Sequence, residues 1–148
     1  MSTPTFEGTN PLVSDAFVVT YHAAEDLDVG LVVQFSAGTG MAFQVKATTG
    51  LVKQCCGITV TKALSGKKIS VACRGIVRAI ASAAIAVGDL VVSAANGKVA
   101  ALADVVDTDL ISSAGIALAI NKSRMIVGKA ISAAATNGDT VYVQLLIP

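Results

Sequence analysis

The sequence predicts an all-β fold in which short antiparallel strands form one compact barrel or sandwich. Three observations support this prediction. Hydrophobic residues alternate with a period of two, turn-forming residues recur at short intervals, and the 148 residues suffice for one ordinary domain. A chain of this length buries a core without disulfides or a structural metal.

The strand prediction is strongest over 69–79, where apolar residues at odd positions alternate with more polar ones. The same alternation appears at 17–22, 31–36 and 140–147. It is typical of half-buried strands, whose side chains point alternately to the two faces of a sheet.

Turn signals separate the predicted strands. They lie at 37–40, 65–67, 96–97 and 137–138. Two short segments, 79–86 and 99–106, are expected to be loop or a single turn.

Residues 1–15 differ from the rest of the chain. They hold two of the three prolines and show no hydrophobic periodicity. We therefore expect an extended N-terminal arm at 1–15, followed by a single β domain at 16–148. A frayed terminus is the simpler alternative, although Phe6, Leu12 and Val13 are unusually apolar for a solvated tail.

A weak internal repeat emerges when the chain is moved by 58 residues, which places 17–60 on 75–118. Identical pairs include Val19 with Val77, Gly30 with Gly88 and Val33 with Val91. A chain rich in Ala, Val and Gly produces several such pairs by chance. The hypothesis is that there are two similar β halves, and it predicts that they superpose strand for strand.

The charge content limits the kinds of partner. Charged residues make up 14% of the chain, where about 25% is usual, so part of the surface is expected to lie against another protein. The net charge of +1 gives no electrostatic footprint for nucleic acid. No apolar run reaches the roughly 18 residues of a membrane helix, and no signal peptide is visible. We expect neither nucleic acid nor a membrane as a partner.

Searches for catalytic and cofactor motifs find no supported site. Phe43 stands where a dinucleotide fingerprint needs its third Gly, and no Gly-x-Ser-x-Gly occurs. Ser65 and Lys68 match Ser-x-x-Lys, but they sit in a predicted turn without the partner motifs of penicillin-recognising enzymes. His22 is the only histidine and no motif surrounds it, so we expect a structural role. The sequence predicts no enzyme, no catalytic residue, no cofactor and no metal site.

The three cysteines are an odd number, and Cys55 and Cys56 are adjacent. On a strand their thiols point to opposite faces, which is poor geometry for one metal ion. Cys73 falls on the predicted inward face of its strand. We expect all three to be small buried residues in a reducing compartment, without a disulfide framework.

Gly followed by Asp recurs directly before predicted strands, at 88–89 and 138–139. Gly adopts positive φ in tight turns, and Asp accepts hydrogen bonds from neighbouring backbone amides. These pairs are therefore interpreted as architectural. The expected structural turn residues are Gly30, Gly75, Gly88, Asp89, Gly97, Gly128, Gly138 and Asp139.

The order of several short motifs resembles a known family. These motifs are Gly75-Ile-Val-Arg-Ala79, Ile85-Ala-Val-Gly-Asp-Leu-Val-Val92, Asn96-Gly-Lys-Val99, Ile126-Val-Gly-Lys-Ala130 and the closing Gly138-Asp-Thr-Val-Tyr-Val-Gln-Leu-Leu146. Together they look like the capsid cement, or decoration, proteins of tailed bacteriophages. The resemblance covers 70–147 well and 16–60 loosely.

The resemblance implies a β-tulip or β-barrel-like domain that forms homotrimers on the outside of the capsid. There it would contact the major capsid protein and stabilise the expanded head by bridging capsomers. The protein would be a virion component made in the bacterial cytoplasm, and the family has no catalytic residues to carry over. Some members use an N-terminal arm, and composition selects Thr3, Pro4, Thr5, Phe6, Pro11, Leu12 and Val13 as its contacts.

Two other interpretations remain open. The chain would instead be another phage structural module, such as a tail or head-fibre domain of similar β architecture. A small-ligand-binding β-barrel is less favoured, because it needs a pocket with convergent polar groups and the sequence offers no such cluster.

Overall fold

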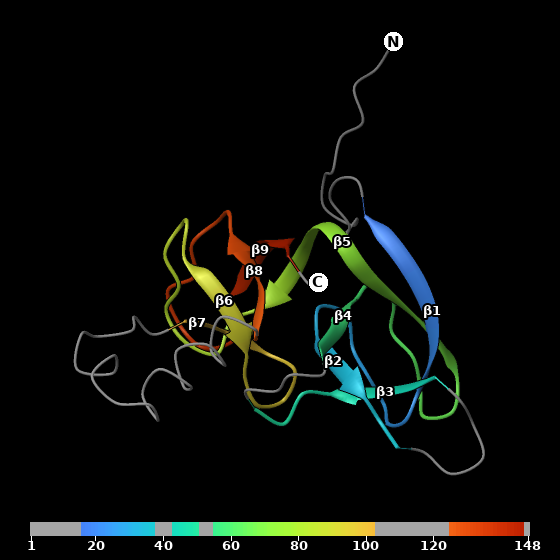
Figure 1. Ribbon diagram of the computed structural model, residues 1–148. Helices are drawn as coiled ribbons and strands as arrows, with labels where there is room; N and C mark the ends of the chain where they lie inside the picture. The colour runs from blue at the N-terminus through green and yellow to red at the C-terminus, as the bar shows by residue number, and fades with distance from the viewer. Residues whose placement is uncertain (1–15, 38–42, 51–54, 103–124, 147–148) are drawn as a thin grey trace, which may run out of the picture.

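The computed structural model describes residues 16–37, 43–50, 55–102 and 125–146 (Figure 1). Within these ranges the chain forms strands and no helix, which confirms the predicted all-β fold. The strands are β1 (Phe17–Ala23), β2 (Val32–Phe35), β3 (Gln44–Ala47), β4 (Cys55–Thr59), β5 (Lys68–Ile80), β6 (Leu90–Ser93), β7 (Val99–Ala101), β8 (Ile126–Ala130) and β9 (Thr140–Leu145).

The predicted alternation is clearest in β9. Val141, Val143 and Leu145 are buried, whereas Thr140 and the residues between them are exposed. The same alternation fails in β2, where the adjacent Val32 and Val33 are both fully buried. They belong to two different packed clusters, one on each face of the strand. A strand with protein on both sides cannot show a simple inside–outside pattern.

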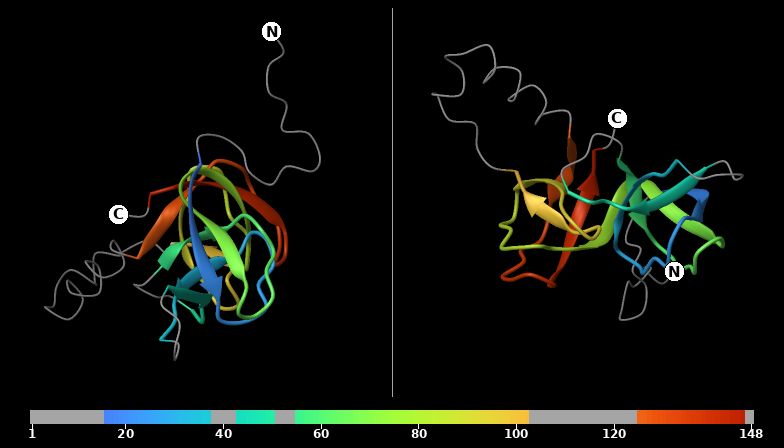
Figure 2. Two further views of the ribbon diagram at one scale, coloured as in Figure 1. Left: turned by 90° about the vertical axis from the view of Figure 1, so that its right-hand side faces the viewer. Right: turned by 90° about the horizontal axis from the view of Figure 1, so that it is seen from below.

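The strands close into two barrels that share β5. In the first barrel the strand order is β1-β3-β2-β4-β5, and pairing of β1 with β5 closes it. In the second barrel the order is β5-β9-β8-β6-β7. The parallel bridge between Ala81, just after β5, and Val99 in β7 closes this one. Figure 2 shows the two lobes side by side, with β5 running from one into the other.

The strand pairing supports the hypothesis of two similar halves, although 103–118 of the aligned segment lie outside the described residues. The antiparallel pairs β1–β5, β2–β3, β2–β4 and β4–β5 have counterparts in β5–β9, β6–β7, β6–β8 and β8–β9. The parallel contact of Ala23 with Val45 corresponds to that of Ala81 with Val99. A register shift follows Val33 in β2 and also its counterpart Val91 in β6.

The hydrophobic interiors repeat in the same way. The cluster inside the first barrel is Ala23, Leu27, Val33, Val45, Cys56, Ala63, Ile69 and Val71. Strand pairing places Ala81, Ile85, Val91, Val99, Val127, Ala134, Val141 and Val143 at the equivalent positions, and all eight are buried in the second cluster. Each barrel is thus filled mainly by small and β-branched side chains.

Two predictions about loops need correction. The segment 79–86 was expected to be loop or a single turn, but Ala79 and Ile80 end β5, and Ala81 and Ile85 make bridges. The segment 99–106 was expected to be loop or a single turn, but 99–101 form β7 and 103–106 lie outside the described residues. Short Ala-rich runs suggest helix or loop locally, and here pairing with distant strands decides their conformation.

Candidate functional site

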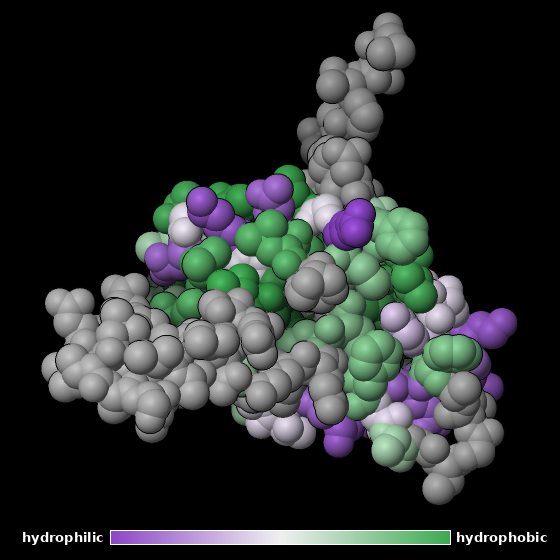
Figure 3. Space-filling model, in the orientation of Figure 1, coloured by the Kyte–Doolittle hydropathy of each residue, from purple (hydrophilic) through white to green (hydrophobic). Residues whose placement is uncertain are grey.

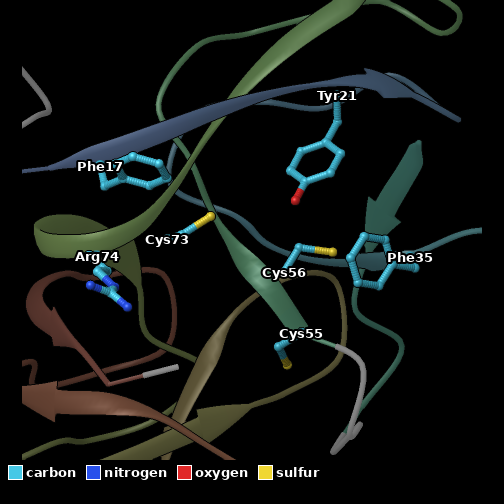
Figure 4. A pocket seen from close by; sticks show the side chains of 7 residues that line it. All are labelled: Phe17, Tyr21, Phe35, Cys55, Cys56, Cys73 and Arg74. Atoms are coloured by element: carbon cyan, nitrogen blue, oxygen red, sulfur yellow. The ribbon is translucent and has the colours of Figure 1, made fainter. Parts of the chain in front are cut away.

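A pocket of about 500 Å³ lies at one end of the first barrel (Figure 4). We call it the mouth pocket, and its lining residues are Phe17, Tyr21, Phe35, Cys55, Cys56, Cys73 and Arg74. The rings of Tyr21 and Phe35 meet edge to face, with centroids 5.9 Å apart and planes inclined at 76°. Phe17 and Phe35 remain 61% and 50% exposed, so the pocket presents aromatic surface to its surroundings.

The cysteines of the mouth pocket are poor nucleophiles. Burial, together with the neighbouring Cys55 and Cys73, raises the pKa of Cys56 to about 12. Burial also raises the pKa of Cys55, and its hydrogen bond with Ser93 lowers this pKa by a smaller amount. Burial raises the pKa of Cys73, and Arg74 partly opposes this. A thiol that stays protonated at neutral pH neither attacks an electrophile nor binds a metal readily.

The three cysteines have the thiol form, with no disulfide among them. Cys56 is buried as expected, but Cys55 and Cys73 are only half-buried because the end of the barrel is open around them. Side chains of both Cys55 and Cys56 line the pocket, although they are neighbours on β4. Among the described residues, no group of metal-binding side chains occurs.

The other residues considered for chemistry are separated from this pocket. His22 is half-buried at the end of β1, and its Nδ1 atom has no hydrogen-bond partner among the described residues. Ser65 lies in the turn before β5 and donates its hydroxyl to the Ala24 carbonyl. Lys68 begins β5 and is exposed. The structure therefore does not bring these residues together as a catalytic group.

Four of the expected turn glycines lie in turns with positive φ, namely Gly30, Gly88, Gly97 and Gly138. Two of these turns are held by the following aspartate. The Asp89 carboxylate accepts a hydrogen bond from the Ala86 amide at 2.9 Å. The Asp139 carboxylate accepts two, from Ala135 and Thr136, each at 3.0 Å.

Gly75 and Gly128 are not in turns, which corrects their assignment. Gly75 lies inside β5 with φ of 98°, between Arg74, which pairs with β1, and Ile76, which pairs with β9. Gly128 lies inside β8, where a Cβ atom would collide with the carbonyl oxygen of Gln144. In both cases the missing side chain serves a bend or a close contact within the sheet rather than a reversal of the chain.

The seven residues predicted as arm contacts, from Thr3 to Val13, lie outside the described residues. Sequence reasoning also missed the aromatic mouth pocket. Phe17 and Tyr21 are four residues apart on a strand and so share one face, a signal that was available. Nothing in the local sequence of Phe35 places it beside them.

A second surface was not foreseen. Paired residues on adjacent strands point to the same side of a sheet, and this gives each barrel an outer row. In the first barrel the outer row is Val32, Ile58 and Ala72. In the second it is Leu90, Lys129 and Gln144. The first row is fully buried, whereas all three residues of the second row are exposed.

Apolar side chains flank this exposed row. Ile131, Val87 and Tyr142 are all exposed on the second barrel. Figure 3 shows one face of the molecule on which hydrophobic residues gather over the second barrel, with hydrophilic ones among them. Within the described residues, no helix is long and apolar enough to cross a membrane.

Comparison with known families decides what kind of protein carries these surfaces. The family model described as phage cement protein matches residues 13–145, which is most of the chain. The chain belongs to the phage cement protein family. This phage cement protein is therefore a structural component of a bacteriophage particle, as the order of its motifs suggested.

A solved structure gives the same architecture. The head fiber gp8.5 N base in bacteriophage phi29 is similar to this cement protein with a TM-score of 0.58 and 15% sequence identity. The match covers 88% of this chain and 94% of that chain, so it extends over both barrels. At this identity the likeness concerns the fold. No curated protein sequence matches the chain.

Proposed function

We propose that this protein binds the outer surface of a phage capsid as a homotrimer and stabilises the expanded head by bridging capsomers. Membership of the phage cement protein family is the observation that carries the proposal. The major capsid protein would be its partner, and the virion its location after synthesis in the host cytoplasm. The chain would act through binding alone, without a cofactor.

The exposed surface supports a binding role. Large apolar side chains such as Phe17, Phe35, Val87 and Ile131 are exposed in a chain with few charges. Exposed apolar patches are typical of sites of protein interaction. A trimer that contacts several capsid subunits at once would gain affinity through effective concentration, even where each contact is weak.

Cosedimentation with DNA-free expanded heads tests capsid binding. The protein is expected to pellet with heads in a saturable manner and to stay in the supernatant without them. A tail module would stay in the supernatant in both cases. Failure to bind expanded heads would contradict the proposal.

The similar head-fiber base makes a head-fibre module the second candidate. Both candidates would pellet with heads, so stabilisation has to be measured separately. A cement protein is expected to raise the temperature at which filled heads release their DNA. A head-fibre module would leave that temperature unchanged.

The N-terminal arm at 1–15 is proposed as part of the capsid contact, through Thr3, Pro4, Thr5, Phe6, Pro11, Leu12 and Val13. An extended segment that adds a strand to a capsid sheet edge would contribute backbone hydrogen bonds. Deletion of residues 2–12 should then weaken head binding and leave the urea unfolding midpoint unchanged. Undiminished binding by the truncated chain would contradict the role of the arm.

A further inference from the structure

The mouth pocket of the first barrel has a counterpart in the second barrel that is filled. Strand pairing places Ala79 at the position of Tyr21, Ser93 at Phe35, Val127 at Cys56 and Leu145 at Cys73. These four counterparts are all buried. The second barrel therefore has its equivalent end closed, whereas the end of the first barrel is open.

The first barrel of the same chain covers this end of the second barrel. The Ser93 hydroxyl donates to the Gly50 carbonyl at 2.8 Å, and the Thr48 hydroxyl donates to the Ala94 carbonyl at 2.8 Å. The Val32 amide donates to the Gly97 carbonyl at 2.7 Å. These bonds hold the β6–β7 end of the second barrel against the β2 side of the first.

The same contact buries the outer row of the first barrel. Val32, Ile58 and Ala72 belong to one packed cluster with the interior of the second barrel, and each is fully buried. Their counterparts Leu90 and Lys129, with Gln144, have no such cover among the residues that the structure describes and are exposed. Each barrel thus has one mouth and one outer row. Within the chain, the mouth of the second barrel contacts the outer row of the first barrel.

We propose that the two surfaces left over bind each other between copies: the mouth pocket of one copy receives the outer row of the second barrel of a neighbour. The contact repeats, between chains, the one that already joins the two barrels. It joins different surfaces on the two partners, so it propagates from copy to copy and closes into a ring when the rotation allows.

The residues on the two surfaces are chemically complementary. The outer row has Lys129 at its centre, between Leu90 and Gln144. The mouth pocket offers three aromatic rings, which attract a cation through their faces and pack against its aliphatic stem. Ile131, the counterpart of the buried Val60, is 42% exposed beside the row.

Lys129 and Gln144, the polar residues of the second row, fit a surface that is exposed to water in the free monomer. The first row never meets water once the chain is folded, and it consists of Val, Ile and Ala. Arg74, which has the same charge as Lys129, also lines the mouth pocket. Its counterpart Leu146 is 49% exposed despite the internal contact, which places the equivalent position at the rim.

This inference rests on the proposed self-association and not on capsid binding. Two variants test it, each carrying charges on one surface only. The row variant is Leu90→Asp with Ile131→Asp, and the mouth variant is Phe17→Asp with Phe35→Asp. All four side chains are exposed, so folding should be retained and is checked by the unfolding midpoint. Leu64→Asp, which changes an exposed residue of the first barrel outside both surfaces, is the control.

Molar mass by light scattering gives the outcome. The wild-type chain and the Leu64→Asp control should form the same oligomer. The row variant alone and the mouth variant alone should each self-associate with an affinity lower by about tenfold or more. An equimolar mixture of the two variants should form heterodimers, because it contains one intact mouth and one intact row. Monomeric wild-type protein, or a mixture that stays monomeric, would overturn the inference. Head binding by such a monomer would leave the cement function standing.

Discussion

Gly57 and Gly128 occupy the same place in the two barrels, and the reason is steric. A Cβ on Gly57 would collide with the Ala72 carbonyl, and one on Gly128 with the Gln144 carbonyl. Each glycine lets two adjacent strands approach closely beside a register shift. The sequence drew attention to Gly128 through a motif, but only the pairing reveals that backbone proximity, not a turn, requires it.

Substitution of Gly128 by Ala tests this packing. The added methyl should force the strands apart and lower the free energy of unfolding by about 1–3 kcal/mol, as measured by urea denaturation. Gly50→Ala is the matched control, because nothing lies within 4 Å of the position of its Cβ. Equal effects of the two substitutions would show that close strand approach is not the cause.

Asp139 makes the stability depend on pH. The backbone amides of Thr136 and Ala135 hold the pKa of this carboxyl below its ordinary value. Its contribution is therefore fully present above the unfolded-state pKa of about 4. It is lost as the pH falls through the lower folded-state pKa.

The Asp139→Asn variant should therefore be less stable than wild type at pH 7, and the difference should shrink as the medium is acidified toward and below the folded-state pKa. Urea midpoints across the acidic range measure this. A stability difference between wild type and Asp139→Asn that is independent of pH would argue that the hydrogen bonds from the backbone amides to the carboxylate have no electrostatic role.

At the scale of elements, β5 shows both the reach and the limit of sequence patterns. The alternation at 69–79 predicted a strand, and the structure has one at Lys68–Ile80. The pattern did not reveal that one half of this strand belongs to each barrel. Hydrophobic alternation indicates which residues are buried, but it does not indicate which strands pack over them.

The turn between β6 and β7 joins the barrels. Asn96 and Gly97 both have positive φ, at 61° and 72°, as a two-residue hairpin turn requires. Gly97 also lies against Leu31 and Val32 of the first barrel, so the turn is a contact as well as a reversal. The Asn-Gly pair predicted the turn, but its docking partner is far away in the sequence.

Gly97→Ala should separate these two roles when compared with Gly66→Ala. Both glycines have positive φ, so each substitution should cost about 1–2 kcal/mol for conformation alone. Gly66 has open space around its Cβ position, whereas a Cβ on Gly97 would lie 2.9 Å from that of Leu31. The Gly97 variant should therefore show the larger loss in chemical denaturation, and equal losses would indicate that the turn is not a packing contact.

At the scale of the whole molecule, the repeat was detectable in the sequence only in part. The offset between equivalent residues is 58 at Val33 and Val91, as the comparison without gaps assumed. It becomes 54 at Ala47 and Ala101, and 71 at Gly57 and Gly128. Loops of different length move the later strands out of step, so the ungapped placement of 17–60 on 75–118 is wrong at Gly57, whose counterpart is Gly128. The open mouth pocket also could not be predicted, because its lining comes from strands brought together only by barrel closure.

The two barrels should unfold in one transition, because they share a strand and the buried outer row joins them. Leu27 and Ile85 are equivalent core residues of the two barrels. Leu27→Ala and Ile85→Ala should each lower the stability by about 2–5 kcal/mol. Calorimetry should show a single peak that moves to lower temperature in both variants. Two separated peaks, of which each variant moves only one, would contradict a common transition.

The thirteen residues of β5 run without interruption from one barrel into the other. A force that pulls the two barrels apart is therefore carried by covalent backbone along this strand, and not by the packed surface between them alone. Tension along β5 also loads its hydrogen bonds to β1 and β9 in shear, so many bonds must break together. If neighbouring capsomers pull on opposite ends of this molecule, its stiffest direction is the line of that single strand.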